Sequence, residues 1–298
     1  MSNSNKHEPA EFYLYRYQIS VDKSPIQLQF GEDITREKLY EERNRYLLQA
    51  LETIANSPST DSSYTYKIEA QPNDTQILLF VQAERTKTIT QDKQDYHVPH
   101  QPYGWVAIDL DPHIQTIGIT SRGDLKAKHV FSDLDKKLQS ILSAKHLNIF
   151  IEAIRKHRAF WQIVDDNRDK IKEVGIIINP PNMPELTSTF DKELSQFTES
   201  AGAKQTALIL KAKKDATLNI EESNPRLNAL ANYADRGGAK YYFKTTESLT
   251  KITPEGKQDI LRGVPVENTD RLNIQTDGDE HYKSILTRIR EWCRLPRR

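Results

Sequence analysis

Val174-Gly175-Ile176-Ile177-Ile178 is the stretch of the sequence that decides the fold. A continuous apolar run of this kind, rich in β-branched residues, predicts a strand that is buried on both faces at a central position of a sheet. Thr206–Ala212 is a second apolar run and predicts a strand beside the first, also in the interior. A helix expected over Glu185–Ala201 would cover both strands.

The residues that follow alternate between helix and strand signals. Asn224-Pro225 is typical of a helix N-terminus, and Gly237-Gly238 of a helix end. Lys240–Thr245 predicts another strand. Residues 278–294 predict a last, amphipathic helix, because their apolar positions recur at helical spacing. The second half is therefore expected to be an α/β arrangement.

The first half has the pattern of antiparallel strands. Aromatic and polar residues alternate over Phe12–Val21, which is typical of a strand. Further strands are expected at Pro25–Phe30, Tyr64–Ala70, Gln76–Glu84, Tyr103–Leu110 and Ile114–Ser121, with helices at Asp33–Ala55 and Phe131–Ala144, and Asp33 as the first helix's N-cap. Arg85–Pro102 is polar without periodicity and predicts a long loop, a class that is often functional or mobile.

Together these patterns predict a mixed α and β fold, with an antiparallel, strand-rich N-terminal half, an α/β C-terminal half and a C-terminal amphipathic helix. The expected organisation is a disordered tail at residues 1–10, an α+β domain at 11–156 and an α/β domain at 157–298. No Gly- or Ser-rich linker marks the boundary, so one continuous core is the alternative.

Composition excludes several classes of protein. The 298 residues contain 42 basic and 42 acidic side chains, so net charge gives no argument for a general nucleic-acid or anionic-membrane surface. The single cysteine, Cys293, excludes an internal disulfide framework and a zinc site of several thiolates. No secretory leader and no transmembrane run are recognisable, so a cytoplasmic location is expected.

Asp109 and Asp111 are the candidate catalytic residues. Positions i and i+2 of a strand point to the same face, and two carboxylates on one face can hold Mg²⁺ for phosphoryl transfer. An apolar strand that ends in aspartates is how ribonuclease-H-like nucleases begin. The alternative is a strand end followed by a tight Asp-Pro turn, which needs no metal or other cofactor.

Two loops are candidate binding sites. Asn182 follows the apolar strand at its carboxyl end, where open α/β sheets bind ligands, with a rigid strand–helix turn as the alternative. Tyr233, Gly237 and Gly238 lie where paired glycines could let a ligand approach the backbone, or simply end a helix. His97 and His100 have metal-ligand spacing, with solvated loop histidines as the alternative.

The last helix is basic. Arg288, Arg290 and Arg294 lie near Trp292, so this helix could contact RNA, DNA or an acidic partner. Cations near a helix C-terminus also interact favourably with its dipole, which is the structural alternative.

Several motifs together resemble an uncharacterised bacterial protein family associated with anti-phage defence loci: Phe160-Trp161, Val174–Ile178 with Pro181-Asn182, Leu218-Asn219, Asn232-Tyr233-Ala234 with Gly237-Gly238, and Tyr103-Gly104-Trp105 with Gln115-Thr116-Ile117. The resemblance implies a defence or toxin–antitoxin setting. With no catalytic signature, it favours a non-catalytic binding or regulatory component that acts through a protein partner from the same locus. A metal-dependent nuclease using Asp109 and Asp111, and a nucleic-acid sensor using the basic helix, are the alternatives. The sequence leaves the oligomeric state open.

Overall fold

Strand β1 (Ala10–Val21) contributes to both of the compact units into which the chain divides. The computed structural model describes residues 10–22, 35–57, 64–156, 158–178, 205–246, 252–253, 256–257, 270–274 and 281–294. Unit 1 comprises residues 1–14, 44–140 and 271–295, and unit 2 comprises residues 15–43, 141–270 and 296–298. The predicted boundary between residues 156 and 157 falls within unit 2. The predicted tail at residues 1–10 and the predicted strand at Pro25–Phe30 lie outside the described residues, apart from Ala10.

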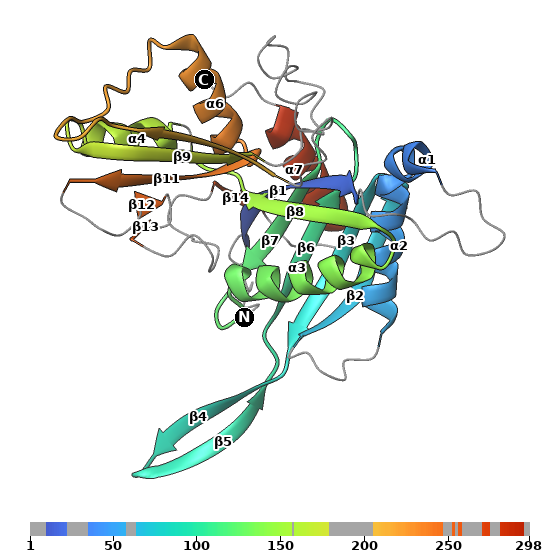
Figure 1. The fold of residues 1–298 in the computed structure, drawn as a ribbon. Coiled ribbons are helices and arrows are strands. Elements are labelled where there is room, and N and C mark those ends of the chain that lie inside the picture. Colours follow the sequence, from blue (N-terminus) through green and yellow to red (C-terminus); the bar gives the residue numbers. More distant parts are fainter. Residues whose placement is uncertain are drawn as a thin grey trace. The chain divides into compact units, whose positions relative to one another are not determined.

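The fold is a mixture of helices and antiparallel sheets with a C-terminal helix, which confirms the predicted fold class (Figure 1). Among the described residues, every helix is too short or too polar to span a lipid bilayer.

Unit 1 is built on a sheet in which the strands follow the order β14-β1-β7-β6-β3-β2. The strands are β14 (Arg271–Ile274), the first part of β1, β7 (Thr116–Ser121), β6 (Tyr103–Asp109), β3 (Gln76–Ala83) and β2 (Tyr64–Asn73). The four strands predicted between Tyr64 and Ser121 are present and form two hairpins, since β2 pairs with β3 and β6 with β7, each antiparallel. The two hairpins form one sheet because β3 also pairs with β6. The β3 residues Ile77, Leu78 and Leu79 are fully buried.

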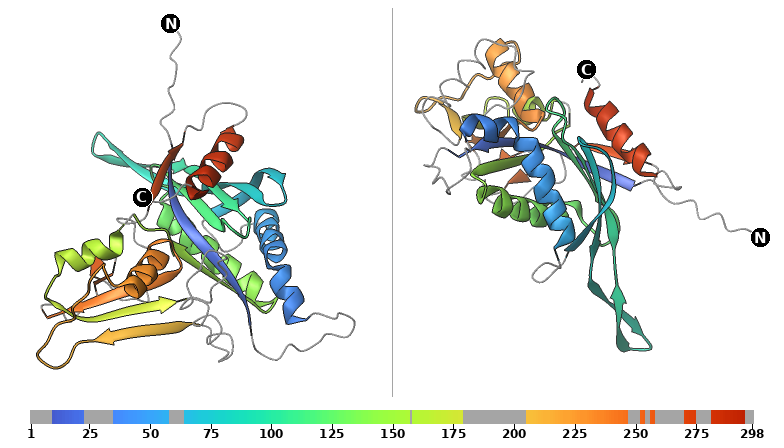
Figure 2. Two further views of the ribbon diagram at one scale, coloured as in Figure 1. Left: turned by 90° about the horizontal axis from the view of Figure 1, so that it is seen from above. Right: turned by 90° about the vertical axis from the view of Figure 1, so that its right-hand side faces the viewer.

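Helices cover both faces of this sheet. Figure 2 shows α7 (His281–Arg294) on one face and α2 (Arg43–Asn56) and α3 (Ala127–Ser143) on the other. Helix α7 buries Ile285, Leu286 and Ile289, the apolar spacing expected from the sequence. Its close approach requires Gly118, because a Cβ added at this position would lie 2.7 Å from Cδ1 of Ile289.

The helix expected over Asp33–Ala55 is divided. Helix α1 (Arg36–Glu41) begins after Thr35, whose side chain accepts a hydrogen bond from the backbone N–H of Lys38, and it ends at the non-helical Glu42 before α2 begins. The N-cap is therefore Thr35, and the prediction of Asp33 was wrong. The two residues are equivalent in chemistry, because each carries a side-chain oxygen that can accept from the first turn.

Unit 2 contains a sheet with the order β10-β9-β11-β12-β13. The strands are β10 (Thr206–Lys211), β9 (Ile171–Ile178), β11 (Ala239–Thr245), β12 (Ile252–Thr253) and β13 (Gly256–Lys257). The central position of β9 is confirmed, since it pairs antiparallel with β10 and β11. The interior position predicted for β10 is wrong: among the strands that the structure describes, β10 lies at the edge of the sheet, and its Ile209 is 47% exposed. The helix predicted at Glu185–Ala201 lies outside the described residues.

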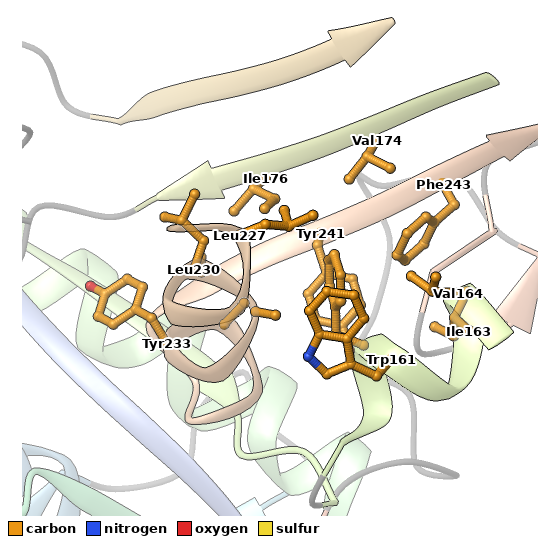
Figure 3. Packing of buried hydrophobic residues seen from close by; sticks show 14 of the residues in the cluster. Trp161, Ile163, Val164, Val174, Ile176, Leu227, Leu230, Tyr233, Tyr241 and Phe243 are labelled. Atoms are coloured by element: carbon orange, nitrogen blue, oxygen red, sulfur yellow. The ribbon is translucent and has the colours of Figure 1, made fainter. Parts of the chain in front are cut away.

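Helices α4 (Ala159–Asp166) and α6 (Pro225–Asp235) pack against this sheet (Figure 3). Phe160 is fully buried and its ring contacts Tyr241 and Phe243 of β11. The predicted start of α6 is confirmed, because the side chain of Asn224 accepts from the N–H groups of Arg226 and Leu227. The second part of β1 pairs antiparallel with β8 (Leu147–Ala153), also in unit 2.

The segment predicted as a long loop is a β-hairpin in unit 1. Strands β4 (Arg85–Gln91) and β5 (Gln94–His100) pair antiparallel and are joined by Asp92 and Lys93. Figure 1 shows this hairpin extending away from β3 and β6, whose ends it connects. We call β4 and β5 together the ribbon. The prediction of an aperiodic loop at Arg85–Pro102 was therefore wrong.

Candidate functional site

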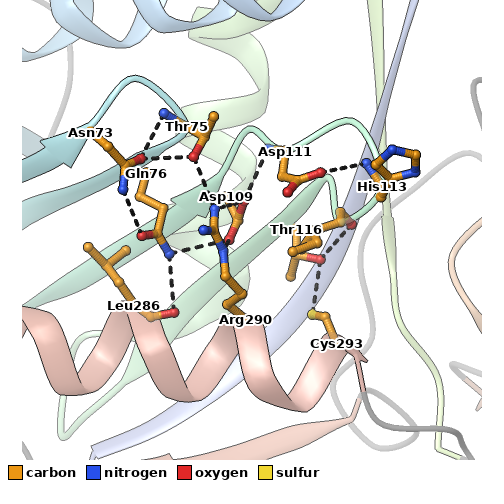
Figure 4. Close-up of polar contacts among 11 residues, drawn as sticks. Asn73, Thr75, Gln76, Asp109, Asp111, His113, Thr116, Leu286, Arg290 and Cys293 are labelled. Atoms are coloured by element: carbon orange, nitrogen blue, oxygen red, sulfur yellow. Dashed lines mark hydrogen bonds and ion pairs between the residues drawn. The ribbon is translucent and has the colours of Figure 1, made fainter.

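Asp109, the first candidate catalytic residue, lies at the end of β6 and forms an ion pair with Arg290 of α7 (Figure 4). Nε of Arg290 lies 2.6 Å from Oδ2 of Asp109, and Nη2 lies 2.8 Å from Oδ1. The backbone N–H of Asp111 donates to Oδ1 at 3.1 Å, and the Gln76 amide donates to Oδ2 at 3.4 Å. The Asp109 side chain is 2% exposed, so its carboxylate is held by protein groups rather than by water.

The ion pair links α7 to the β2–β3 turn as well as to β6. Nη2 of Arg290 also donates to Oγ1 of Thr75 at 3.1 Å, and Gln76 donates to the carbonyl oxygen of Leu286 in α7. The hydrogen bonds to Asp109 raise the pKa of Arg290 above its usual value, although partial burial acts in the opposite direction. A bidentate guanidinium–carboxylate pair fixes the orientation of both groups, so this network positions α7 on the sheet.

The Asp111 carboxylate forms a different hydrogen bond from those of the Asp109 carboxylate. Its Oδ1 accepts a hydrogen bond from the backbone N–H of His113 at 2.9 Å, which stabilises the turn between β6 and β7. A divalent cation at Asp109 would have to displace the guanidinium of Arg290 from both carboxylate oxygens. Across the described ranges, no cluster of three or more His, Cys, Asp or Glu side chains is placed to hold a metal ion. The magnesium-dependent nuclease stays a prediction.

The three arginines predicted as a nucleic-acid contact are in different environments. Arg290 is engaged by Asp109, whereas Arg288 and Arg294 are exposed on α7. Cys293 points toward β7, where its Sγ lies 3.2 Å from Oγ1 of Thr116. Any nucleic-acid contact by this helix would therefore use Arg288 and Arg294, and Arg290 has a structural role in the described contacts.

Tyr233, Gly237 and Gly238 pack against protein in unit 2. A Cβ added at Gly238 would lie 2.3 Å from Cζ of Tyr233, so the ring covers this glycine. The hydroxyl of Tyr233 accepts a hydrogen bond from Gln18 of β1 at 3.1 Å. Gly237 has a φ of 80°, which favours glycine, and a Cβ there would meet Cβ of Arg16 at 3.0 Å. These contacts agree with the alternative interpretation, in which the paired glycines end a helix. Asn182 lies outside the described residues.

Glu173 of β9 lies in a charged cluster that the sequence does not indicate. Its carboxylate accepts from Nζ of Lys244 at 2.9 Å and from the hydroxyl of Tyr242 at 2.8 Å, and Nζ of Lys211 lies 3.7 Å away. Burial acts to raise the pKa of Glu173, but the hydrogen bonds from Lys244 and Tyr242 outweigh it and lower the pKa. Burial and the bond to Glu173 raise the pKa of Tyr242 to about 12.

The Tyr242 ring lies over Gly175, where an added Cβ would be 2.1 Å from Cε1 of the ring. This close contact explains why a glycine lies in the middle of an apolar strand. Gly175 is therefore the sequence signal that could have indicated the cluster. The contacts of Glu173 with Tyr242, Lys244 and Lys211 join neighbouring strands of one sheet, so they describe a stabilising cluster.

The ribbon presents apolar side chains to solvent. Its register places Ile89 opposite Tyr96 and Lys87 opposite Val98, and directly opposite residues share a face. The exposed fractions are 45% for Ile89, 49% for Tyr96 and 42% for Val98. We call these three residues together the apolar face. Arg85 and Lys87 lie on this same side, so the apolar face is bordered by cations.

The opposite side of the ribbon is polar. Thr90 donates to Asp95 at 2.6 Å, and Oγ1 of Thr88 lies 3.2 Å from Nδ1 of His97. His100 instead points toward Asp124, with Nε2 and Oδ2 3.3 Å apart. His97 and His100 therefore have different partners, on opposite sides of the ribbon, and the structure does not bring them together as metal ligands.

Exposed clusters of large apolar side chains mark interaction surfaces more often than isolated ones do. The apolar face of the ribbon is such a cluster, so we take it as the candidate functional site. A comparison with protein-family models finds none that matches the chain, and a comparison with curated proteins finds no match either.

Proposed function

We propose that this protein is a non-catalytic binding component that acts through a protein partner, and that the partner binds the apolar face of the ribbon. The observation that carries the proposal is the simultaneous exposure of Ile89, Tyr96 and Val98 on one side of a hairpin that extends from unit 1. Each of these side chains is about half exposed. Completing their burial would contribute on the order of 1 kcal/mol each to a complex.

The chemistry of the ribbon favours a protein over a nucleic acid as the partner. Phosphate backbones are bound by several cations, and the sequence of the ribbon with its turn contains three, Arg85, Lys87 and Lys93, against the acids Asp92 and Asp95. Arg85 is in addition hydrogen-bonded to the Tyr64 hydroxyl at 2.9 Å. An apolar groove with a few acidic groups at its rim complements the apolar face and Lys87 better.

The setting that we propose is a bacterial anti-phage defence or toxin–antitoxin-type system, with the partner encoded at the same locus. This part of the proposal rests on the motifs quoted from the sequence, such as Phe160-Trp161 and Gly237-Gly238. In the structure Phe160-Trp161 and Gly237-Gly238 pack against other residues of unit 2, so these two motifs support the fold, and the exposed surface of the ribbon is the part that we propose determines specificity.

The test is a triple variant, Ile89→Thr with Tyr96→Thr and Val98→Thr. Threonine keeps the β-propensity of the ribbon and removes its apolar area. Ile68→Thr is the matched control, because Ile68 is also an exposed apolar residue of a unit 1 strand, at 38%. Tagged versions are expressed in a host that carries the native locus, and co-purified proteins are quantified.

We expect a protein of the same locus to co-purify with the wild type and with Ile68→Thr, and to be reduced at least about tenfold with the triple variant. Equal thermal stability of the variants shows that the fold is retained. Recovery of every co-purified protein in the same amount with the triple variant would contradict the proposal.

A further inference from the structure

The two edges of the ribbon differ in their capacity to accept a further strand. Asp92 and Lys93, with φ of 51° and 64°, form a two-residue turn of the type in which both central residues are left-handed. In such a hairpin the flanking pair, here Gln91 and Gln94, exchanges both backbone hydrogen bonds, and bonded pairs then alternate along the ladder. Every second residue of each strand therefore directs its N–H and C=O outward.

On β4 the outward residues are Thr86, Thr88 and Thr90, each with a backbone donor and acceptor. On β5 the outward positions include Pro99, which lacks an N–H and so blunts that edge. All residues of β4 are exposed, and in the part of the chain that the structure describes β4 and β5 pair only with each other. The outer edge of β4 is thus available for strand addition.

The sequence of β4 is complementary to itself. If two copies of β4 pair antiparallel about a two-fold axis at Thr88, Thr88 meets Thr88 of the second copy and Thr86 meets Thr90. Threonine pairs of this kind stabilise antiparallel sheets. On the other side Lys87 lies opposite Ile89, so no cation faces a cation. The remaining pair is Arg85 with Gln91.

We propose that β4 binds β4 of a second copy of this chain in this register and forms a four-stranded sheet from two ribbons. Each of the three threonine pairs exchanges both of its backbone hydrogen bonds. A two-stranded hairpin is marginally stable in water, whereas more strands with an apolar face are stable. Pairing also joins the apolar faces of the two copies into one. The pairing uses the edge of the ribbon and not its apolar face, so it does not depend on the function proposed above.

The first test is sedimentation of purified protein over a range of concentrations up to about 1 mM, the weak end of the specific-association range. We expect the wild type to be a monomer–dimer equilibrium. Thr88→Pro removes the central outward N–H of β4 and leaves the bonds to β5 intact, and it is expected to raise the dimer dissociation constant at least about tenfold.

His97→Pro is the matched control. It also places proline at an outward position, as Pro99 does naturally, and it deletes the same contact between Thr88 and His97, but it affects the edge of β5. We expect it to dimerise like the wild type. A monomeric wild type at all concentrations, or an equal effect of the two prolines, overturns the proposal.

The second test is disulfide trapping in a Cys293→Ser background. Thr88→Cys would bring two thiols together across the two-fold axis, because bonded antiparallel pairs have Cα atoms about 5.5 Å apart, within disulfide range. We expect an oxidised dimer for Thr88→Cys and none for Asp95→Cys, which lies on the edge of β5. Failure of Thr88→Cys to cross-link, or equal cross-linking of both, overturns the register. Binding of the partner can persist in either case, so the two proposals fail separately.

Discussion

The ion pair between Asp109 and Arg290 predicts a strong energetic coupling between these two residues. Arg290→Met keeps most of the side-chain stem but removes the guanidinium. The Asp109 carboxylate, 2% exposed, then keeps the Asp111 N–H and the Gln76 amide as its donors among the described residues. Removing one partner of a buried pair costs about 3–5 kcal/mol. Because the Arg290 side chain is 23% exposed and water can reach the site, we expect about 3 kcal/mol.

Asp109→Asn keeps the volume and removes the charge, at an expected cost of about 2 kcal/mol from the loss of charge-assisted hydrogen bonds. The double variant contains no unpaired buried charge, so it should cost no more than about 3 kcal/mol instead of the sum of about 5. The coupling free energy is therefore expected to be about 2 kcal/mol.

The assay is urea unfolding of the four proteins of this cycle, followed by the fluorescence of tryptophan and by far-UV circular dichroism. Additive single-variant effects, within about 0.5 kcal/mol, would refute a coupled pair. The same variants address the nuclease alternative, under which Asp109→Asn abolishes magnesium-dependent cleavage and leaves the melting temperature nearly unchanged. A melting temperature that falls by several degrees agrees instead with the ion pair.

Three further variants test packing and titration. Gly238→Ala should destabilise unit 2 by about 1–3 kcal/mol because its Cβ would collide with the Tyr233 ring, and Tyr233→Leu in the same chain should recover part of this loss in urea unfolding. Gly118→Ala should cost a similar amount by displacing α7, seen as faster hydrogen exchange of the α7 amides; unchanged exchange would contradict the close approach. The raised pKa of Tyr242, about 12 against 10.0, means that the neutral hydroxyl stabilises the fold fully below pH 10 and that this contribution is lost as pH rises toward 12. Tyr242→Phe should therefore lose less stability than the wild type between pH 9 and pH 11, and it should remove one late-titrating component of the absorbance at 295 nm; equal losses would contradict the role of Glu173 as its partner.

The sequence predicted correctly those elements that depend on neighbouring residues in the chain. The start of α6 follows from Asn224 and Pro225, where a side-chain cap and a preset φ act within one turn. The central position of β9 follows from its apolar run, because burial on both faces leaves no polar alternation.

The ribbon was missed because its strands are exposed on both sides. Thr86, Thr88 and Thr90 alternate with other residues, but β4 contains a single large apolar residue, Ile89, so its hydrophobic alternation is weak. Its turn consists of Asp92 and Lys93 instead of the Asn-Gly or Asp-Gly pair that signals a hairpin.

The candidate site was predictable only in part, because its decisive contacts are distant in sequence. Asp109 and Asp111 satisfied the spacing of a metal pair, but the partner of Asp109 lies 181 residues away in α7. Nothing in the residues around Arg290 identifies which carboxylate it meets. The spacing of two aspartates along a strand shows that they could bind a metal ion together. Which group a carboxylate actually contacts depends on the tertiary structure.

The shared strand β1 has a consequence for how this chain folds during synthesis. Ala10–Tyr13 pair with Arg271–Ile274, and α7 then supplies the guanidinium that neutralises Asp109. A ribosome that has translated only as far as residue 270 has therefore produced a unit 1 that lacks a sheet strand and one covering helix. Contacts between residues so far apart in sequence form slowly, and until they do the nascent sheet exposes apolar surface that a chaperone would recognise.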